Sequence, residues 1–512
     1  MLSSIALPTG FRKKQHWNNV DWYDVRSPYY SNFDFVDHYF QSKNTILRVF
    51  SLVRKLGFRS FSIEELKGND CILKNEEDEL LRKCNDNFKN SEVYRISFFS
   101  SNLDRVSDQD NFLGYVVIKC DFYKEEQPNT YIYEAILPHY RKEKDNNFLH
   151  CKRTYKVEYE FGIFNVTGAL YAQQNGKTNV CAHVALRTVL SLLLPEGDIS
   201  YAKINQIAGI CKYPVNHLTP SHINKVLESH KVFSRMESKK SLEMQKIPSR
   251  SSLLYGNIES RCPSLWAFNV DESQDDVSHI VPVLGHTFNE DSWVACADRK
   301  YFGRKEHYSS ESWLSTYLIH DDNFGPYFCL PKNYLEKQNF SCLVGLHWNN
   351  EHALYSDVVE KTALDYVKMV LNDIKQHPCR PDSSWYRRLE SFVDTNKEKI
   401  NTFILRPTFI RKTEYITFLT IYQMEQHLID QFEKLPDEFW LVEISCPELF
   451  SATRAKIGDI LLTIENDVTL NTSYAKPLAY RLPNIVYFEN DCNKPPQRTT
   501  KISGYLPLWS NQ

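Results

Sequence analysis

The chain has 512 residues, a hydrophobic fraction of 42% and a charged fraction of 24%, which is the composition of a globular protein of about two to four domains. Its net charge of −3, with acids and bases spread along the sequence, gives no electrostatic pattern for nucleic-acid binding. No apolar run approaches the roughly 18 to 20 residues of a membrane helix, and the first residues lack the order of a signal peptide. We therefore expect a cytoplasmic protein without nucleic-acid or membrane partners.

The 13 cysteines are widely scattered and never form a C-x-x-C pair. An odd number without regular spacing favours reduced thiols over a disulfide framework and gives no thiolate zinc site. The sequence also lacks a phosphate-binding loop, a dinucleotide fingerprint and a zinc-protease helix. We expect no cofactor and no metal.

Residues 1–160 are expected to form a mixed region with a β-rich second half. An amphipathic stripe over residues 45–57 predicts a helix. From Val93 onward, β-branched and aromatic runs alternate with Asn, Asp, Gly and Pro turns, which predicts strands at hairpin spacing. These runs cover residues 93–100, 112–123, 130–138 and 153–166.

Residues 161–335 are expected to form a second domain, in which helices precede strands. After a helix that begins near residue 181, two further helices are predicted, with Ser200 and Thr219 as their N-caps. The polar residues 234–250 predict a loop. Strands are then predicted over residues 264–270, 279–286 and 292–298.

Residues 336–512 are expected to form a third domain, again α+β. Residues 438–462 predict a strand followed by a helix. Helical spacing of apolar residues covers 362–377, 383–396 and 420–435, and strand patterns cover 439–445 and 485–490. No internal repeat is present, so the fold class expected for the whole chain is α+β.

The stretch YAQQNGKTNVCAHVALRTVLSLLL, residues 171–194, places Cys181 where a polar, glycine-containing loop becomes an apolar helix. Thr178 or Asn179 is expected to cap this helix. In its first turn, unpaired N–H groups and the helix dipole favour a thiolate. The alternative is a small buried residue, as free cysteines usually are.

An oxyanion beside this thiol would need hydrogen-bond donors. The side-chain amide of Gln173 or Gln174 and the backbone N–H of Cys181 could supply them. A thiolate nucleophile also needs a base, and the base needs a group that orients it.

A histidine and an aspartate further along the chain can fill these two roles. A strand over residues 279–285 places His279 on one face and His286 on the other. A hairpin centred near residues 288–289 then brings Asp298, on the returning strand, beside His279, whereas a one-residue slip would separate the two.

The segment YLIHDDNFGPYFCLP contains a second group of candidates. His320, Asp321 and Asp322 could bind a metal, or Asp321 could replace Asp298 as the group that orients His279. A strand that ends in an Asx-turn before the Gly-Pro pair explains the same residues structurally. We favour the turn and expect it to lie near the site.

The motifs QQNGKTNVCAHVAL, SHIVPVLGH and SWVACAD, in this order, resemble the papain-like cysteine peptidases. They are most similar to the bacteriocin-leader (double-glycine) peptidases, and the Gln-loop-Cys-Ala pattern is also similar to that of Josephin-type deubiquitinases. The resemblance covers roughly residues 165–335. It implies a papain-like central domain, in which a helix carrying the cysteine packs on an antiparallel sheet carrying His and Asp. The implied roles are oxyanion donor for Gln174, nucleophile for Cys181, base for His279 and orienting group for Asp298.

The resemblance implies a cysteine hydrolase that cleaves an amide, peptide or isopeptide bond of a protein or peptide substrate through a thioester. The same groups serve an acyltransferase or a transglutaminase-like enzyme. The chain departs from the family pattern at Ala182, where many members have Gly, and at Arg299, where Pro is frequent.

Two interpretations from other classes stay open. A catalytically idle papain-like module would bind a partner or regulate the flanking domains. Alternatively, the chain is a structural or sensor protein in which Cys181 belongs to the core.

Overall fold

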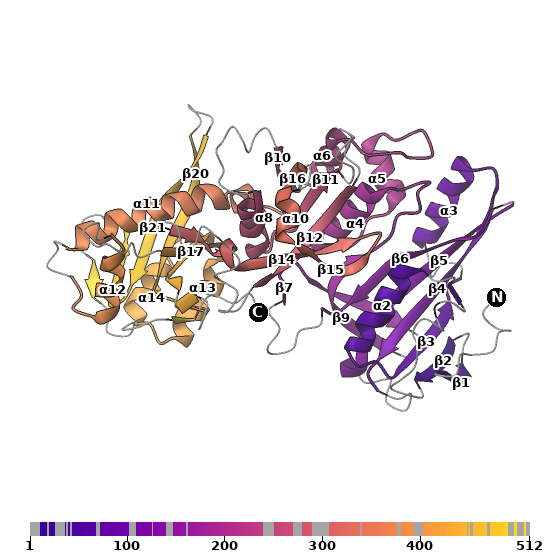
Figure 1. The fold of residues 1–512 in the computed structure, drawn as a ribbon, viewed down its shortest axis with the longest axis horizontal. Helices are drawn as coiled ribbons and strands as arrows, with labels where there is room; N and C mark the ends of the chain where they lie inside the picture. The colour runs from indigo at the N-terminus through magenta and orange to yellow at the C-terminus, as the bar shows by residue number, and fades with distance from the viewer. Residues whose placement is uncertain are drawn as a thin grey trace.

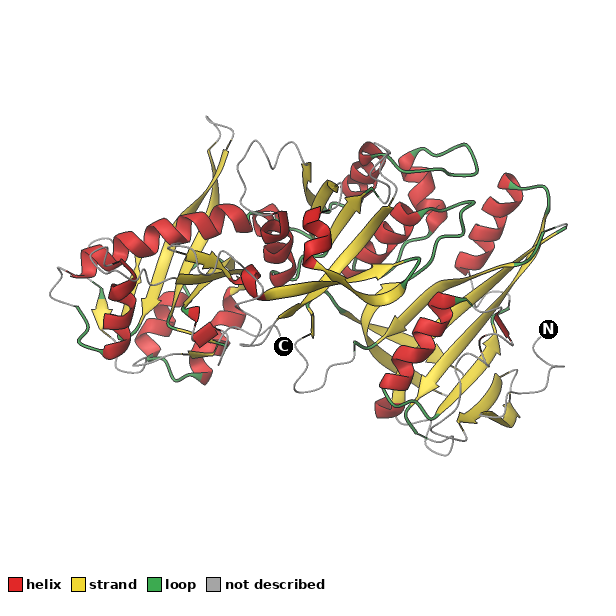
Figure 2. Cartoon of the chain, in the orientation of Figure 1, coloured by secondary structure: helices red, strands yellow, loops and turns green. Residues whose placement is uncertain are grey.

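The structure is a computed structural model, and it combines helices with largely antiparallel sheets, as predicted (Figures 1 and 2). Among the residues it describes, no helix is both long and apolar enough to cross a membrane. The described residues are 11–17, 20–25, 36, 39–40, 43–67, 72–101, 109–124, 126–139, 147–159, 162–238, 250–269, 279–288, 307–337, 340–375, 380–393, 403–447, 449–450, 454–467, 472–489, 496–498 and 506–507.

An eight-stranded antiparallel sheet fills the N-terminal region, with the strand order β1-β2-β3-β4-β5-β6-β9-β8. Helix α2 (Asn44–Lys55) buries its apolar stripe on one face of this sheet, and helix α3 (Ile72–Cys84) contacts β4. The predicted helix and strands of this region are confirmed, except that the run 153–166 is divided between two paired strands. The strands are β1 (Phe11–Trp17), β2 (Val20–Val25), β3 (Ser60–Glu65), β4 (Phe88–Phe99), β5 (Phe112–Tyr123), β6 (Asn129–Leu137), β8 (Arg153–Tyr159) and β9 (Gly162–Tyr171).

A second sheet fills the centre of the chain, with the order β10-β16-β11-β12-β14-β15 and β7 paired to β12. Alternate residues of β11 serve two cores: Leu265 and Ala267 pack with helix α4, whereas Trp266 and Phe268 pack with helix α8. The strands are β7 (Asn147–Leu149), β10 (Phe233–Ser238), β11 (Ser264–Phe268), β12 (His279–Phe288), β14 (Leu314–Asp321), β15 (Gly325–Pro331) and β16 (Phe340–His347). The helices are α4 (Cys181–Leu193), α5 (Tyr201–Ala208), α6 (Pro220–Ser229), α8 (Arg250–Glu259) and α10 (Lys332–Lys337).

The predicted elements of this central region are largely present. Ser200 and Thr219 cap α5 and α6 as expected, each accepting a hydrogen bond from a backbone N–H in the first turn. The prediction of a loop over residues 234–250 is wrong at its start, because β10 pairs antiparallel with β16 there. Residues 239–249 and the predicted strand 292–298 lie outside the described residues.

The N-terminal and central regions share their hydrophobic cores. One cluster joins Phe50 of α2 and Ile96 of β4 to Val281 of β12, and a second joins Phe164 of β9 to Leu186 of α4. The predicted boundary between residues 160 and 161 falls between β8 and β9, which pair over the whole length of β8. The sheet that precedes the cysteine helix is therefore packed continuously with the sheet that follows it.

Strand β7 extends this continuity, because it leaves the N-terminal part of the chain and pairs with β12. The approach is close enough to require a glycine: a Cβ on Gly285 would lie 2.0 Å from the carbonyl oxygen of Phe148. The pairing of β12 with β14 shifts register between Val283 and Gly285.

The C-terminal region is a seven-stranded sheet with helices on both faces. Along β18, Trp440 and Val442 pack with α11 and α12, whereas Phe439 and Leu441 pack with α13 and α14. Strand β13, which precedes residue 335, joins this sheet parallel to β17. The strands are β13 (His307–Ser309), β17 (Phe403–Arg411), β18 (Glu438–Ser445), β20 (Gly458–Asp467), β21 (Thr472–Leu482), β22 (Ile485–Phe488) and β23 (Gln497–Arg498), and the helices are α11 (Ser356–Lys375), α12 (Ser384–Val393), α13 (Lys412–Ile421) and α14 (Gln426–Phe432).

In the described residues, the helices predicted over 362–377 and 383–396 and the strands predicted over 439–445 and 485–490 are confirmed. The single helix predicted over 420–435 is wrong at its start, because α13 ends at Ile421 and α14 begins only at Gln426. The segment after β18 also differs from its prediction. A helix was expected there up to residue 462, but strand β20 begins at Gly458 and pairs with both β18 and β21. A sheet partner on each side outweighs the helical propensity of this short apolar run.

A buried chain of ion pairs joins the central and C-terminal regions. The Arg406 guanidinium lies 2.5 Å from Glu259 of α8 and 2.5 Å from Glu443 of β18. Glu443 also pairs with Lys456 at 2.7 Å, and Lys456 pairs with Asp459 at 2.9 Å. Each carboxylate therefore meets a cation without contact with water.

Replacement of Arg406 should reveal the cost of leaving two buried carboxylates unpaired. We expect Arg406→Met to lower the free energy of unfolding by about 3–5 kcal/mol. The matched control is Arg411→Met on the same strand, because Arg411 is 73% exposed and pairs with Glu438 only at 3.9 Å. Thermal and urea unfolding of both variants measure the difference. Equal losses in the free energy of unfolding would contradict a role of Arg406 in joining the two regions.

Candidate active site

Helix α4 begins at Cys181, with Val180 in extended conformation as its N-cap residue. The N–H of Val180 donates to Nδ1 of His183 at 3.3 Å. The N-cap residue is therefore held by a side chain from the first turn of the helix. The expectation that Thr178 or Asn179 caps the helix is wrong, because both side chains bond to Asn175 in the preceding loop and to Glu77 of α3. The helix itself begins where the sequence predicts.

The loop before Cys181 is closed by hydrogen bonds of its own asparagines. Asn175 Oδ1 accepts from the N–H groups of Lys177 and Thr178, both at 2.9 Å, and Asn179 Oδ1 accepts from the N–H of Asn175 at 2.9 Å. This is an Asx-type turn that brings the two ends of the loop together. The loop over residues 175–179 is therefore held as one compact turn between Gln174 and Val180.

His279 is the first residue of β12 and is buried. Its Nε2 lies 3.2 Å from Oδ2 of Asp321 and 3.5 Å from Oδ1 of Asp322. The thiol of Cys181 also acts on this imidazole and raises its pKa. The structure thus brings Cys181, His279 and an aspartate together, as the sequence predicts, but the aspartate it shows is Asp321 at the end of β14.

The protonation of this group follows from its surroundings. Burial lowers the pKa of His279, but its hydrogen bonds with Asp321 and Cys181 and the charges of both aspartates outweigh this effect and raise the pKa to about 10. Burial raises the pKa of Asp321, whereas the hydrogen bond and the charge of His279 hold it below its usual value. Burial raises the pKa of Asp322 to about 6. His279 is therefore an imidazolium at neutral pH.

Asp321 also forms the predicted Asx-turn. Its Oδ1 accepts from the N–H of Asn323 at 2.8 Å and from the N–H of Phe324 at 3.1 Å. One carboxylate oxygen thus fixes the turn while the other faces His279. The turn and the contact with His279 therefore use different oxygens of the same carboxylate.

His320, Asp321 and Asp322 do not converge as a metal site. His320 Nδ1 lies 3.1 Å from the carbonyl oxygen of Leu170, away from the two carboxylates. Instead His279, Asp321 and Asp322 place their ligand atoms within 4.8 Å of one another, close enough to hold a metal ion.

The two candidate glutamines have different surroundings. Gln173 is held on both ends of its amide: Oε1 accepts from Thr45 Oγ1 and from the N–H of Ile132, and Nε2 donates to the carbonyl oxygen of Asp322, all at 2.9 Å. Gln174 is half-buried, and its amide makes no hydrogen bond with any residue that the structure describes. Gln173 therefore fixes the Asp322 backbone.

His286 does not contact the cysteine. Its Nε2 lies 2.6 Å from Oε1 of Glu259 and 3.0 Å from Nε2 of His150. The expectation that it lies on the face opposite His279 is wrong, because the register shift after Val283 turns it toward α8 with the residues that pack there.

A second buried group is formed by His150, Glu259 and His286. No sequence motif indicates this group, because its members come from three separate segments. Their ligand atoms also lie within 4.8 Å of one another. Burial lowers the pKa of His150 to about 3, so this imidazole is neutral. Arg406 also pairs with Glu259, so this carboxylate already has a cation beside it.

Asp298, the predicted orienting residue, lies outside the described residues. Comparisons of the chain with protein-family models, with curated proteins and with solved structures gave no match. The interpretation of the site therefore depends on its geometry and on its motifs.

The cysteine should be the most reactive thiol of the chain. We expect iodoacetamide at neutral pH to label Cys181 faster than Cys211 and Cys329, although these two are more exposed, because the Cys181 thiol lies at a helix N-terminus beside His279. Peptide mapping by mass spectrometry measures the rates. We expect the faster labelling of Cys181 to be lost in His279→Ala. Equal labelling rates of the three cysteines in the wild type would contradict an activated thiol.

The raised pKa of His279 predicts how stability depends on pH. Between pH 6.5 and about 10 the folded chain keeps a proton that the unfolded chain releases, so this contribution is full below pH 6.5 and is lost as pH rises through about 10. We expect the melting temperature of the wild type to fall more steeply over this range than that of His279→Gln. NMR titration of the imidazole in Asp321→Asn should give a lower pKa, and an unchanged value would contradict the role of Asp321.

Proposed function

We propose that the chain is a cysteine hydrolase of papain-like type, with Cys181 as nucleophile and His279 as its acid-base partner. The observation that carries the proposal is the thiol at the first residue of α4 in contact with an imidazole whose Nε2 is held by Asp321. A helix that carries the cysteine and packs on an antiparallel sheet that carries the histidine supports the papain-like architecture.

The first half-reaction uses the charges of this pair. The Cys181 thiolate attacks the carbonyl carbon, and the oxygen takes up the electron pair. The N–H of Cys181 and the amide of Gln174 can stabilise this oxyanion. The imidazolium of His279 then gives its proton to the leaving amine, the C–N bond breaks and a thioester remains.

The second half-reaction reverses the proton transfer. His279, now neutral, accepts a proton from water as the water attacks the thioester. The C–S bond breaks, the acid product leaves and the thiolate and imidazolium are restored. Transfer to another amine in place of water would make the same apparatus an acyltransferase or transglutaminase-like enzyme.

Asp321 supports this chemistry as the orienting group. A carboxylate fixed by two backbone N–H groups cannot turn away, so it holds the ring of His279 and stabilises its charge. Asp298 remains the alternative from the sequence, and paired variants at the two positions separate them.

The substrate class we propose is an amide, peptide or isopeptide bond of a protein or peptide. A cytoplasmic location fits the thiols, because the nine cysteines that the structure describes are all free. An idle binding module is the rival from another class, and it predicts no covalent intermediate.

The test uses p-nitrophenyl acetate, an activated ester that needs a nucleophile but no substrate-binding contacts. We expect a burst of p-nitrophenolate and an acetyl group on Cys181 by mass spectrometry, both lost in Cys181→Ala and His279→Ala. A library of fluorogenic peptide amides then tests amide cleavage. EDTA should leave the burst unchanged, and a wild type without acetyl-Cys181 would favour the idle module.

Variants of the supporting residues should rank in a defined order. We expect Gln174→Ala to slow acylation on the order of 10²- to 10³-fold, because it removes an oxyanion donor. Asp321→Asn should slow acylation strongly, whereas Asp298→Asn should have little effect. The reverse order for the two aspartates would restore Asp298 as the orienting residue.

A further inference from the structure

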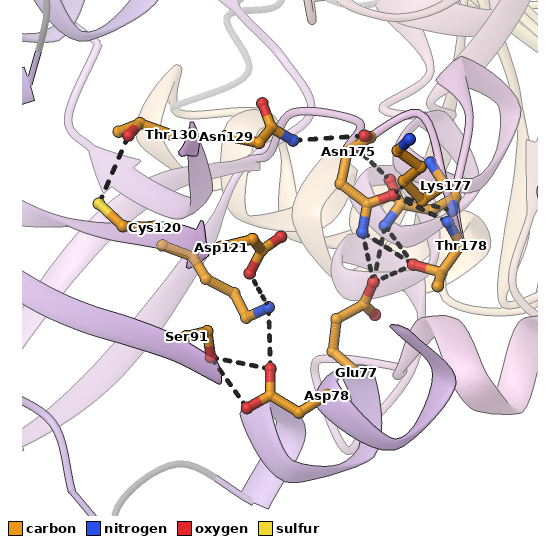
Figure 3. A network of polar contacts seen from close by, with 12 residues as sticks. Glu77, Asp78, Ser91, Cys120, Asp121, Asn129, Thr130, Asn175, Lys177 and Thr178 are labelled. Atoms are coloured by element: carbon orange, nitrogen blue, oxygen red, sulfur yellow. Dashed lines mark hydrogen bonds and ion pairs between the residues drawn. The ribbon is translucent and has the colours of Figure 1, made fainter. Parts of the chain in front are cut away.

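The loop before Cys181 is anchored from outside the central sheet, by helix α3 of the N-terminal region. Figure 3 shows the carboxylate of Glu77 pointing into this loop, while the neighbouring Asp78 points away toward Ser91. Asp78 also pairs with Lys119 of β5 at 3.1 Å. Asp78 thus fixes α3 on its own sheet, whereas Glu77 reaches across to the loop.

Glu77 meets the loop at three side chains through one oxygen. Its Oε1 accepts from Asn175 Nδ2 at 2.6 Å, from Asn179 Nδ2 at 3.2 Å and from the hydroxyl of Thr178. Glu77 is only 2% exposed, so water does not compete for these donors. The same asparagines form the turn that separates Gln174 from Cys181 along the chain.

On its other side the loop is held within the central region. Asn205 of α5 donates to the carbonyl oxygen of Thr178 at 3.0 Å, and its Oδ1 lies 2.8 Å from Nε2 of His183. The turn is therefore clamped between α5 and α3. Without Glu77, the Thr178 hydroxyl would lose its acceptor, and the side-chain amides of Asn175 and Asn179 would keep only that hydroxyl as an acceptor. The turn would then relax on the side of α3.

We infer that Glu77 is a positioning residue of the active site, which holds the loop so that Gln174 and the N–H of Cys181 face the same carbonyl oxygen. This inference rests on the proposed function. It makes the N-terminal region part of the catalytic apparatus, because α3 supplies a contact that the central sheet does not. A displacement of about 1 Å in such a loop can lower a rate on the order of 10²-fold.

The experiment compares Glu77→Ala, Glu77→Gln and Ser91→Ala in the full chain. The Gln side chain keeps an oxygen at the Oε1 position, so it can still accept from all three donors. Ser91→Ala removes hydrogen bonds from the same network on the side away from the loop. The readouts are the rate of Cys181 acylation by p-nitrophenyl acetate, the melting temperature and hydrogen exchange of the amides over residues 175–181.

We expect Glu77→Ala to slow acylation on the order of 10²-fold and to speed exchange in the loop. Glu77→Gln should restore most of the rate, and Ser91→Ala should keep the rate despite a similar loss of melting temperature. Unchanged acylation in Glu77→Ala beside an active wild type would overturn this inference alone. A wild type that is not acylated would instead overturn the proposed function, and the positioning role with it.

Discussion

A carboxylate removed from water needs a cation, and Glu259 and Glu443 share the guanidinium of Arg406. Glu259 belongs to the helix behind the central sheet and Glu443 to the C-terminal sheet, so neither region can move away without exposing a buried charge. Glu259 also holds His286, at the far end of the strand that begins with His279. The position of this strand is thus tied to the C-terminal region as well as to its own sheet.

The candidate site is assembled in the same way, by contacts that cross between regions. Thr45 of α2 fixes Gln173, which in turn fixes the backbone of Asp322. Arg48 of the same helix donates to the carbonyl oxygen of Tyr327, just beyond the turn formed by Asp321. The loop before Cys181 and the turn at Asp321 are therefore both held by helices of the N-terminal region. The positions of the Asp321 and Asp322 carboxylates beside His279 depend on the same contacts.

Local patterns were sufficient to predict the start of α4 at Cys181, the strand at His279 and the turn at Asp321. They could not show that Asp321 lies beside His279, because the neighbour of a strand is decided by the topology of the sheet. They also failed where a distant partner competes with a local preference. Asn179 is a good N-cap residue by itself, but Glu77 engages its side chain. The prediction for the face of His286 is wrong for a related reason. A register shift within a strand cannot be recognised from the alternation of residues in the sequence.

The pairing of β7 with β12 has a consequence for synthesis of the chain on the ribosome. His286 of β12 follows His150, the residue just after β7, by 136 residues. Strand β7 is therefore synthesised long before the strand with which it pairs. Contacts of such long range slow folding and leave strand edges uncovered in the meantime. The N-terminal sheet can form while translation continues, but β7 stays open to pairing with other chains until β12 emerges. Slower translation before β12 would therefore be expected to increase aggregation of the nascent chain.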